Sequence, residues 1–521
     1  MNQRVSRRDW ILQSAAIGMP AAWLTPGFAL AQTQPGGGRI VNVRSNRPFD
    51  SFDPAFRGGS MDGNVCRVVY QRLVQYKSGS AELELDAAAD IRQVSPTVIE
   101  FRLKTGQQFS GGFGEMTADD VKFSIERILA PPVAGGRSSP YVEDWDGTTV
   151  EVKGKYEGRL VLNRPRASLF DSIIGNSSGS ILSRRAVEQR GASTMSMSPV
   201  GSGQYVVASA ERQRGVVLLR HAGYNGSRKA SINEINYRVI PDAKTTELGL
   251  RSGEVDMAVL PVGIGETLRG VPGLSVTIEP GLGFVWLGMN VEKRPLTDIR
   301  VRQAIRLALD VDQLIKAGYD GKAPRLNTVV PPQVLGHWRE APAYRRNVAE
   351  AKALLAAAGQ TAMRLRLTLL NQSEYMNMAL VAQALLAEVG IAVEIDSQPG
   401  GSYWSAGKGD AGKTLDLYIA RFGANFDPNF ALKWFSKEQI GTWNWSRWAS
   451  ADFDRVFQAA EHEMDRAKRA QFVVEAQRAM DASAAFVWIT NEANAVVHRT
   501  TVRPVGIPGW NDFQFADFTA A

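Results

Sequence analysis

The chain is poor in cysteine and histidine. Among its 521 residues there is one cysteine, Cys66, and there are four histidines, none of them in an HxxxH, HExxH or CxxC pattern. A single cysteine excludes an internal disulfide, and scattered histidines disfavour a transition-metal site built by the protein. Cys66 has no histidine near it in sequence, so we expect an inert buried thiol.

Long apolar runs and clusters of basic residues are also missing. After the first thirty residues no stretch of about eighteen consecutive apolar residues occurs, so we expect no membrane-spanning segment in the mature chain. The formal net charge is +7, but lysine and arginine are dispersed, which disfavours nucleic acid as a partner. No repeat of about 20 to 50 residues is evident, which excludes solenoids and propellers. Length and a 44% hydrophobic content favour a globular protein of about three domains.

The first 31 residues are typical of an export signal. Arg7-Arg8 precedes a weakly apolar stretch that closes on Ala29-Leu30-Ala31, a small-x-small cleavage pattern. Residues 6–12 are similar to the twin-arginine pattern, and an ordinary secretory signal is the alternative. Residue 32 is glutamine, so the new N-terminus offers no cysteine for lipid attachment. We therefore expect a free periplasmic protein.

Strand and helix patterns alternate along the chain. Ile40 to Val43 and Thr97 to Leu103 alternate like strands, and the stretch from Asn64 to Tyr76 is typical of a helix. Thr117 and Asp120 have the spacing of a capping box, which predicts the start of another helix. This alternation predicts an α/β protein.

Two short motifs suggest chemistry that their surroundings do not favour. Residues 407–414 satisfy the GxxxxGKT spacing of a phosphate-binding loop, but residues 415–419 alternate like a strand where that loop requires a helix. Residues 175–179 match the GxSxG elbow of serine hydrolases, with a short apolar entry. Nucleotide binding is therefore disfavoured, and a secreted serine hydrolase using Ser177 is kept as the alternative function.

Aromatic residues gather in the last third of the chain. Trp443, Trp445 and Trp448 fall within six residues, near Trp404 and Trp434. A tryptophan offers a large apolar face and one N–H group, which suits the wall of a pocket for a polar organic ligand. The alternative is that these side chains belong to the core.

Several segments, taken in order, resemble the family 5 extracytoplasmic solute-binding proteins, the peptide, nickel and opine group that feeds ABC importers. The segments are Asp53-Pro54, residues 69–74, residues 101–106 with Phe109, residues 117–124, residues 199–205, residues 290–310 and residues 351–355. The resemblance spans nearly all of the mature chain.

The resemblance implies a two-lobed periplasmic-binding-protein fold of type II, in its large three-domain α/β form. Lobe I would comprise residues 32–76, 199–280 and 486–521, with an inserted domain II at 77–198 and lobe III at 281–485. The crossings between the lobes would fall near residues 281–283 and 485–486. It also implies a monomer that binds a peptide-like or other small polar solute between the lobes, closes on it and delivers it to an ABC permease, without catalysis, metal or cofactor.

The resemblance also implies where charged anchors should lie. In dipeptide-binding members an acid pairs with the peptide amine, and at the matching position this chain has Ala424. The arginine that pairs with the carboxylate has no counterpart at residues 371–373. Free dipeptides are therefore disfavoured, because a buried ammonium or carboxylate needs a partner. The ligand-contacting residues that we predict are Arg57, Ser60 and Met61 from lobe I, and Trp286, Asn290, Trp404, Arg421, Asn425, Trp443 and Trp445 from lobe III. Asp427 is either a further ligand contact or a cap before Pro428.

Overall fold

The structure is a computed structural model that describes residues 39–131, 138–510 and 512–521. The predicted signal peptide lies outside these residues. No helix in the described ranges is both long and apolar enough to cross a lipid bilayer.

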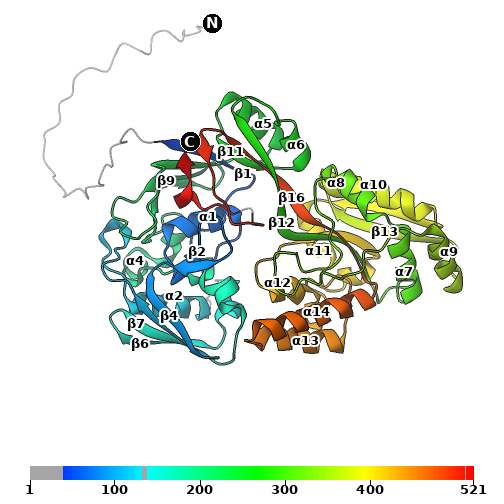
Figure 1. Cartoon of the computed structure of the whole chain (residues 1–521), viewed down its shortest axis with the longest axis horizontal. Helices are drawn as coiled ribbons and strands as arrows, with labels where there is room; N and C mark the ends of the chain where they lie inside the picture. Colours follow the sequence, from blue (N-terminus) through cyan, green and yellow to red (C-terminus); the bar gives the residue numbers. More distant parts are fainter. Residues whose placement is uncertain (1–38, 132–137, 511) are drawn as a thin grey trace, which may run out of the picture. The chain divides into compact units, whose positions relative to one another are not determined.

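A single ten-stranded sheet joins the two lobes. Its strand order is β14-β13-β15-β12-β16-β11-β1-β10-β9-β8. The two central strands are long and antiparallel: β12 covers Leu274–Met289 and β16 covers Phe486–Arg499. Their register shifts between Pro280 and Phe284, opposite residues 491–493. Figure 1 shows β12 and β16 passing between the two lobes, as the two-lobed fold requires.

Lobe I is the part built around β1 and β8–β11. Its strands are β1 (Ile40–Ser45), β8 (Tyr205–Glu211), β9 (Gly215–Arg220), β10 (Glu234–Val239) and β11 (Met257–Leu260). Its helices are α1 (Ser60–Val69), α5 (Ala243–Ser252) and α6 (Val262–Glu266). Two two-stranded sheets accompany it. One pairs β2 (Val74–Tyr76) with β3 (Leu83–Leu85), and the other pairs β17 (Val502–Arg503) with β18 (Thr519–Ala520).

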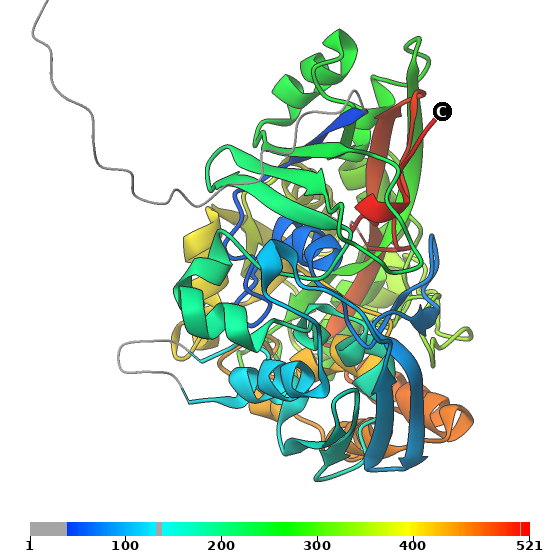
Figure 2. The same cartoon turned by 90° about the vertical axis from the view of Figure 1, so that its left-hand side faces the viewer.

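Domain II is built on a separate four-stranded antiparallel sheet. Its strands are β4 (Ala88–Ser95), β5 (Val98–Leu103), β6 (Thr148–Gly154) and β7 (Glu157–Leu162), in the order β4-β5-β7-β6. Its helices are α2 (Ala118–Leu129), α3 (Val142–Trp145) and α4 (Arg184–Arg190). Figure 2 shows this sheet below lobe I.

Lobe III covers both faces of its part of the sheet with helices. Its strands are β13 (Met363–Leu370), β14 (Ile391–Gln398) and β15 (Leu417–Phe422). An aliphatic core lies under α7 (Ile299–Ala308), α8 (Val311–Tyr319), α9 (Val348–Ala357) and α10 (Ser373–Ala387). An aromatic core fills the other face, with α11 (Gly400–Ala406), α12 (Pro428–Leu432), α13 (Ala451–His462) and α14 (Arg466–Ala482).

Local sequence signals correspond well with these elements, with one correction. The capping box of Thr117 and Asp120 opens α2 as predicted. The helix predicted from Asn64 to Tyr76 is wrong in its second half, because α1 ends at Val69 and residues 74–76 form β2. Pairing of β2 with β3 supplies hydrogen bonds that a local pattern does not reveal. The residue boundaries of the lobes stay a prediction.

Candidate ligand-binding site

Five aromatic rings of lobe III form a connected group that we call the aromatic wall. They are Trp404, Phe422, Phe430, Trp434 and Trp443. Trp443 contacts Trp404, Phe422 and Trp434 with ring centroids 6.2, 5.9 and 5.9 Å apart, and Phe430 contacts Trp434 at 5.3 Å. All except Phe422 keep part of their surface exposed. Two lysines lie over the rings, Lys408 over Trp443 and Lys433 over Trp434.

Three of the predicted site residues are buried behind this wall and support it. Trp445 is 1% exposed, packs on Tyr403 and Tyr418, and donates its indole N–H to the Thr442 carbonyl at 3.2 Å. Trp286 is equally buried in the aromatic core. Asn290 is fully buried and donates to the Leu415 carbonyl at 3.0 Å, which fixes the end of the 407–414 segment. In this structure these side chains support the wall and do not form its surface.

Asp427 and Asn425 shape the turn between β15 and α12. Asn425 Oδ1 accepts from the Asp427 N–H at 2.8 Å, and Asp427 Oδ1 accepts from the Asn429 N–H at 2.8 Å. The other carboxylate oxygen of Asp427 accepts from Arg469 Nη2 at 2.6 Å in an almost fully buried pair. Of the two roles predicted for Asp427, the structure shows the helix cap. Ala424, in the same turn, is partly buried against the aromatic core.

The lobe I side of the site is charged. Arg57 places its guanidinium 5.4 Å from the Tyr141 ring centroid, and its Nη2 lies 3.5 Å from Asn176 Oδ1. Ser60 begins α1 and is exposed. Met61 is 1% exposed and packs in the lobe I core, so it holds α1 in place and presents no surface here.

Lobe III touches lobe I and domain II directly. The Phe426 ring stacks on Trp510, with centroids 5.3 Å apart, and lies 5.9 Å from Tyr76. Further along, the Ala167 N–H donates to the Glu461 carbonyl at 3.2 Å, and His462 Nδ1 lies 2.8 Å from the Pro165 carbonyl oxygen. The described chain therefore has its lobes in contact.

Arg421 lies at the hinge end of β15, on the sheet face away from the aromatic wall. Its Nε and Nη2 donate to Glu492 Oε2 at 2.8 and 2.5 Å. Glu492 belongs to β16, opposite the register shift of the crossing strands. The negative charge of Glu492 raises the pKa of Arg421 above its usual value. Arg421 thus remains charged and is held beside the hinge.

The two motifs that suggested other chemistry occupy unsuitable settings. Ser177 is buried in a single 3-10 turn, Ser177–Gly179, and a short helix, Leu169–Ile174, leads into it where a hydrolase elbow needs a strand. Each of the four histidines directs Nδ1 at a backbone carbonyl oxygen. The serine hydrolase alternative therefore has no support in this geometry.

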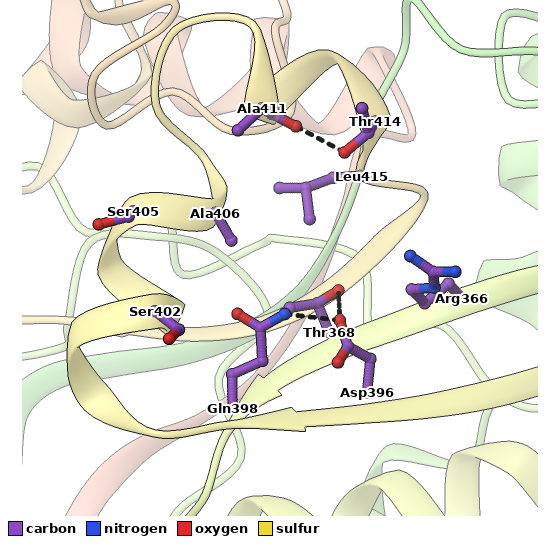
Figure 3. Close-up of a pocket in the computed structure, with 10 residues that line it drawn as sticks. All are labelled: Arg366, Thr368, Asp396, Gln398, Ser402, Ser405, Ala406, Ala411, Thr414 and Leu415. Carbon is purple, nitrogen blue, oxygen red and sulfur yellow. Dashed lines mark hydrogen bonds between the residues drawn. The ribbon is translucent and has the colours of Figure 1, made fainter.

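The 407–414 segment lines a surface pocket of lobe III. Figure 3 shows this pocket, of about 330 Å³, between β13, β14 and α11, with Thr368 and Gln398 donating to Asp396. Strand β15 follows the segment, so no helix N-terminus faces a phosphate. None of the predicted ligand-contacting residues lines this pocket. Among the described residues, no three His, Cys, Asp or Glu side chains are grouped to hold a metal ion.

Some residues of the site were not predicted. Phe430 and Trp434 extend the wall, Trp510 of lobe I stacks on Phe426, and Glu492 pairs with Arg421. Trp434 could have been found from the same tryptophan cluster that indicated Trp443. Glu492 lies 71 residues from its partner, so no local spacing reveals the pair. Cys66 is buried as expected, and burial raises the pKa of its thiol.

The chain matches the family model of bacterial extracellular solute-binding proteins, family 5, over residues 85–443. It is 28% identical to the dipeptide-binding protein of Escherichia coli, covering 88% of each chain. It is 26% identical to the probable D,D-dipeptide-binding periplasmic protein DdpA of the same organism, covering 84% of this chain and 86% of the relative.

A solved structure shares the fold. The periplasmic binding protein DppA of Helicobacter pylori, in complex with the peptide STSA, aligns with a TM-score of 0.79 at 26% identity, over 93% of this chain and 98% of that one. These relatives are named as dipeptide-binding or periplasmic binding proteins, and the Helicobacter pylori protein is described as ABC transporter-associated. The chain therefore belongs to the bacterial extracellular solute-binding proteins of family 5, and the fold and periplasmic location predicted from its sequence are confirmed.

Proposed function

We propose that this protein captures a peptide-like or other small polar solute between its lobes, as a monomer and without chemistry, and delivers it to an ABC permease. The names of its relatives support this, since they bind dipeptides, D,D-dipeptides and the peptide STSA. We place the ligand between the partly exposed face of the aromatic wall and Arg57 with Ser60.

The observation that carries the proposal is the direct contact between the two lobes that the crossing strands β12 and β16 join. Phe426 of lobe III stacks on Trp510 of lobe I, so the closed state has contacts of its own. A ligand that touches both lobes only in this state shifts the equilibrium towards it. The closed form is then the one that the permease would receive.

Ala424 disfavours one class of ligand, the free dipeptides. The family resemblance implies that Ala424 takes the place of an acid that pairs with the peptide amine in dipeptide-binding members, and alanine carries only a methyl group there. We infer that a free dipeptide is not the preferred ligand, because its ammonium would lose an ionic partner on burial. The charged anchor at the place that we propose for the ligand is Arg57.

Native mass spectrometry of freshly purified protein tests the proposal first, by identifying a co-purified solute. Titration calorimetry with that solute should then show that Trp443→Ala and Arg57→Ala each weaken binding by about tenfold or more. Trp338→Ala is the control, because this lobe III tryptophan makes no ring contact with the wall among the described residues. Unchanged affinity in both site variants would show that the solute does not bind between the aromatic wall and Arg57.

The absence of catalysis has a separate test. A fluorophosphonate probe labels activated serines, and we expect no labelling of the purified protein. Labelling that disappears in Ser177→Ala would contradict the proposal and restore the hydrolase alternative.

A further inference from the structure

The surface pocket of lobe III in Figure 3 is separate from the ligand site proposed above. Its volume is about 330 Å³, and it lies between β13, β14, α11 and the 407–414 segment. One water molecule takes up roughly 30 Å³ in the liquid, whereas small-molecule sites occupy about 300 to 1,000 Å³. The pocket is therefore large enough for one small organic molecule.

The side of the pocket formed by the sheet is polar. In the parallel pair of β13 and β14, Thr368 lies opposite Asp396, and Gln398 follows two residues further along β14. Side chains alternate along a strand, and Leu367 and Val393 point into the aliphatic core. The three polar side chains therefore share the opposite sheet face, which the pocket exposes to ligands.

These three side chains hold one another and leave acceptor atoms unused. Thr368 Oγ1 and Gln398 Nε2 both donate to the same oxygen, Asp396 Oδ2, at 3.1 and 2.8 Å. No described residue forms a hydrogen bond or an ion pair with Asp396 Oδ1 or with Gln398 Oε1. Thr368 is 1% exposed, so this arrangement is fixed by packing before any ligand arrives.

The remaining sides of the pocket supply a cation and an apolar surface. Arg366 lies beside Asp396 in Figure 3, and its Nε is 3.9 Å from Glu394 Oε1, with both side chains more than half exposed. Ala406 and Leu415 lie across the pocket from Asp396. The two charged residues that line the pocket, Arg366 and Asp396, have opposite signs, so the lining has no net formal charge.

The 407–414 segment forms its side of the pocket as a compact turn. A Cβ added at Gly407 would overlap the Trp445 indole, and one added at Gly412 would overlap the Gly407 carbonyl. Asn290 Nδ2 donates to the Leu415 carbonyl at 3.0 Å and fixes the end of the segment. The glycine spacing that suggested a phosphate-binding loop is thus explained by close packing beside this pocket.

We propose that this pocket is a second binding site, for a small uncharged polyol such as a monosaccharide. A hydroxyl group donates one hydrogen bond and accepts up to two. Neighbouring hydroxyls can therefore donate to Asp396 Oδ1 and Gln398 Oε1 and accept from Arg366, while the C–H groups of the ligand contact Leu415. A charged ligand fits less well, because an anion would face Asp396 and an ammonium group would face Arg366. The site does not depend on solute capture between the lobes.

The test is titration calorimetry with D-glucose, D-galactose, D-ribose, L-arabinose and myo-inositol in turn, at millimolar concentration. We expect at least one to bind, with little dependence on salt because the ligand is uncharged. Asp396→Asn should weaken its binding at least tenfold. The asparagine oxygen can still accept from Thr368 and Gln398, so the variant keeps the local structure and replaces only the unused acceptor by an NH₂ group.

Two control variants locate the binding. Glu394→Gln changes an exposed acid on β14 that does not line the pocket, and it should leave the affinity unchanged. Arg57→Ala removes the charged anchor of the site between the lobes and should also leave polyol binding unchanged.

The other outcomes contradict the inference. If none of the five polyols binds, or if Asp396→Asn binds them as wild type does, the inference is overturned. If ethanolamine or inorganic phosphate binds in the pocket and no polyol does, the ligand class is wrong. If Arg57→Ala abolishes polyol binding and Asp396→Asn does not, the polyol occupies the site between the lobes, which overturns this inference and supports the proposed function.

Discussion

The two sides of the proposed site use different chemistry. Lobe III presents the aromatic wall, and its supports are buried rings such as Trp445 together with the buried Asp427–Arg469 pair. Lobe I presents the positive charge of Arg57, and its surroundings are tied by ion pairs such as Arg67 with Asp512 at 3.0 Å. Apolar area gives affinity with little directional preference, whereas charges fix orientation. We therefore expect lobe III to determine how tightly a solute binds and lobe I to determine its orientation.

The sharpest test of the lobe III side is Asp427→Ala. The change removes a helix cap and the carboxylate that accepts a hydrogen bond from the buried Arg469 Nη2. Breaking a buried ion pair by removing one partner costs about 3 to 5 kcal/mol. We expect that loss in the free energy of unfolding, measured by guanidinium titration followed by tryptophan fluorescence.

An exposed pair provides the matched control. Asp452→Ala removes an acid that is 86% exposed and pairs with Arg455 on α13, so its effect should be small. A loss below about 1 kcal/mol for Asp427→Ala would mean that the turn before α12 does not carry the wall.

Phe426→Ala tests the contact between the two sides. The ring stacks on Trp510 and lies near Tyr76, and aromatic pairs of this kind contribute about 0.5 to 1.5 kcal/mol each. Because these contacts exist only with the lobes together, we expect a more open average shape in solution scattering and roughly tenfold weaker binding of the solute. The control is Phe457→Ala, whose ring stacks within lobe III on Phe453. Equal scattering profiles for wild type and Phe426→Ala would show that this contact does not hold the lobes.

Signals carried by neighbouring residues predicted the fold well. The helix that begins at Ala118 follows from Thr117 and Asp120, because a capping box needs only residues three apart. The helix predicted through residues 70–76 failed because β2 gains its hydrogen bonds from β3, whose paired residues lie seven to eleven positions further along the chain. The ten-stranded sheet, whose order is far from sequence order, could be predicted only through the family resemblance.

The sequence predicted which types of residue form the site better than it predicted which of their side chains are exposed. Trp443 and Trp445 are two residues apart and equally plausible from sequence, but only Trp443 keeps an exposed face. Asn290 looked like a polar contact, and its amide is used to hold the Leu415 backbone. The orientation of a side chain at a turn depends on packing between distant segments. It therefore cannot be predicted from local patterns in one sequence.

The smallest effect that we predict concerns acid and distinguishes lobe I from lobe III. Glu247 on α5 accepts hydrogen bonds from Lys244, Arg251 and Thr267, all at 2.9 Å, and these lower its pKa from an ordinary 4.5 to about 2. A lowered pKa favours the ionised form in the folded state, so this stabilisation is present above pH 4.5 and is lost as the pH falls towards 2. Hydrogen exchange of α5 should therefore accelerate in acid before that of lobe III.

Glu247→Gln should remove about 1 kcal/mol of local stability at neutral pH and flatten the acid dependence, whereas the exposed control Glu254→Gln should change neither. If the α5 amides of wild type and Glu247→Gln exchanged alike between pH 5 and about 2.5, charge would not be what holds this part of lobe I.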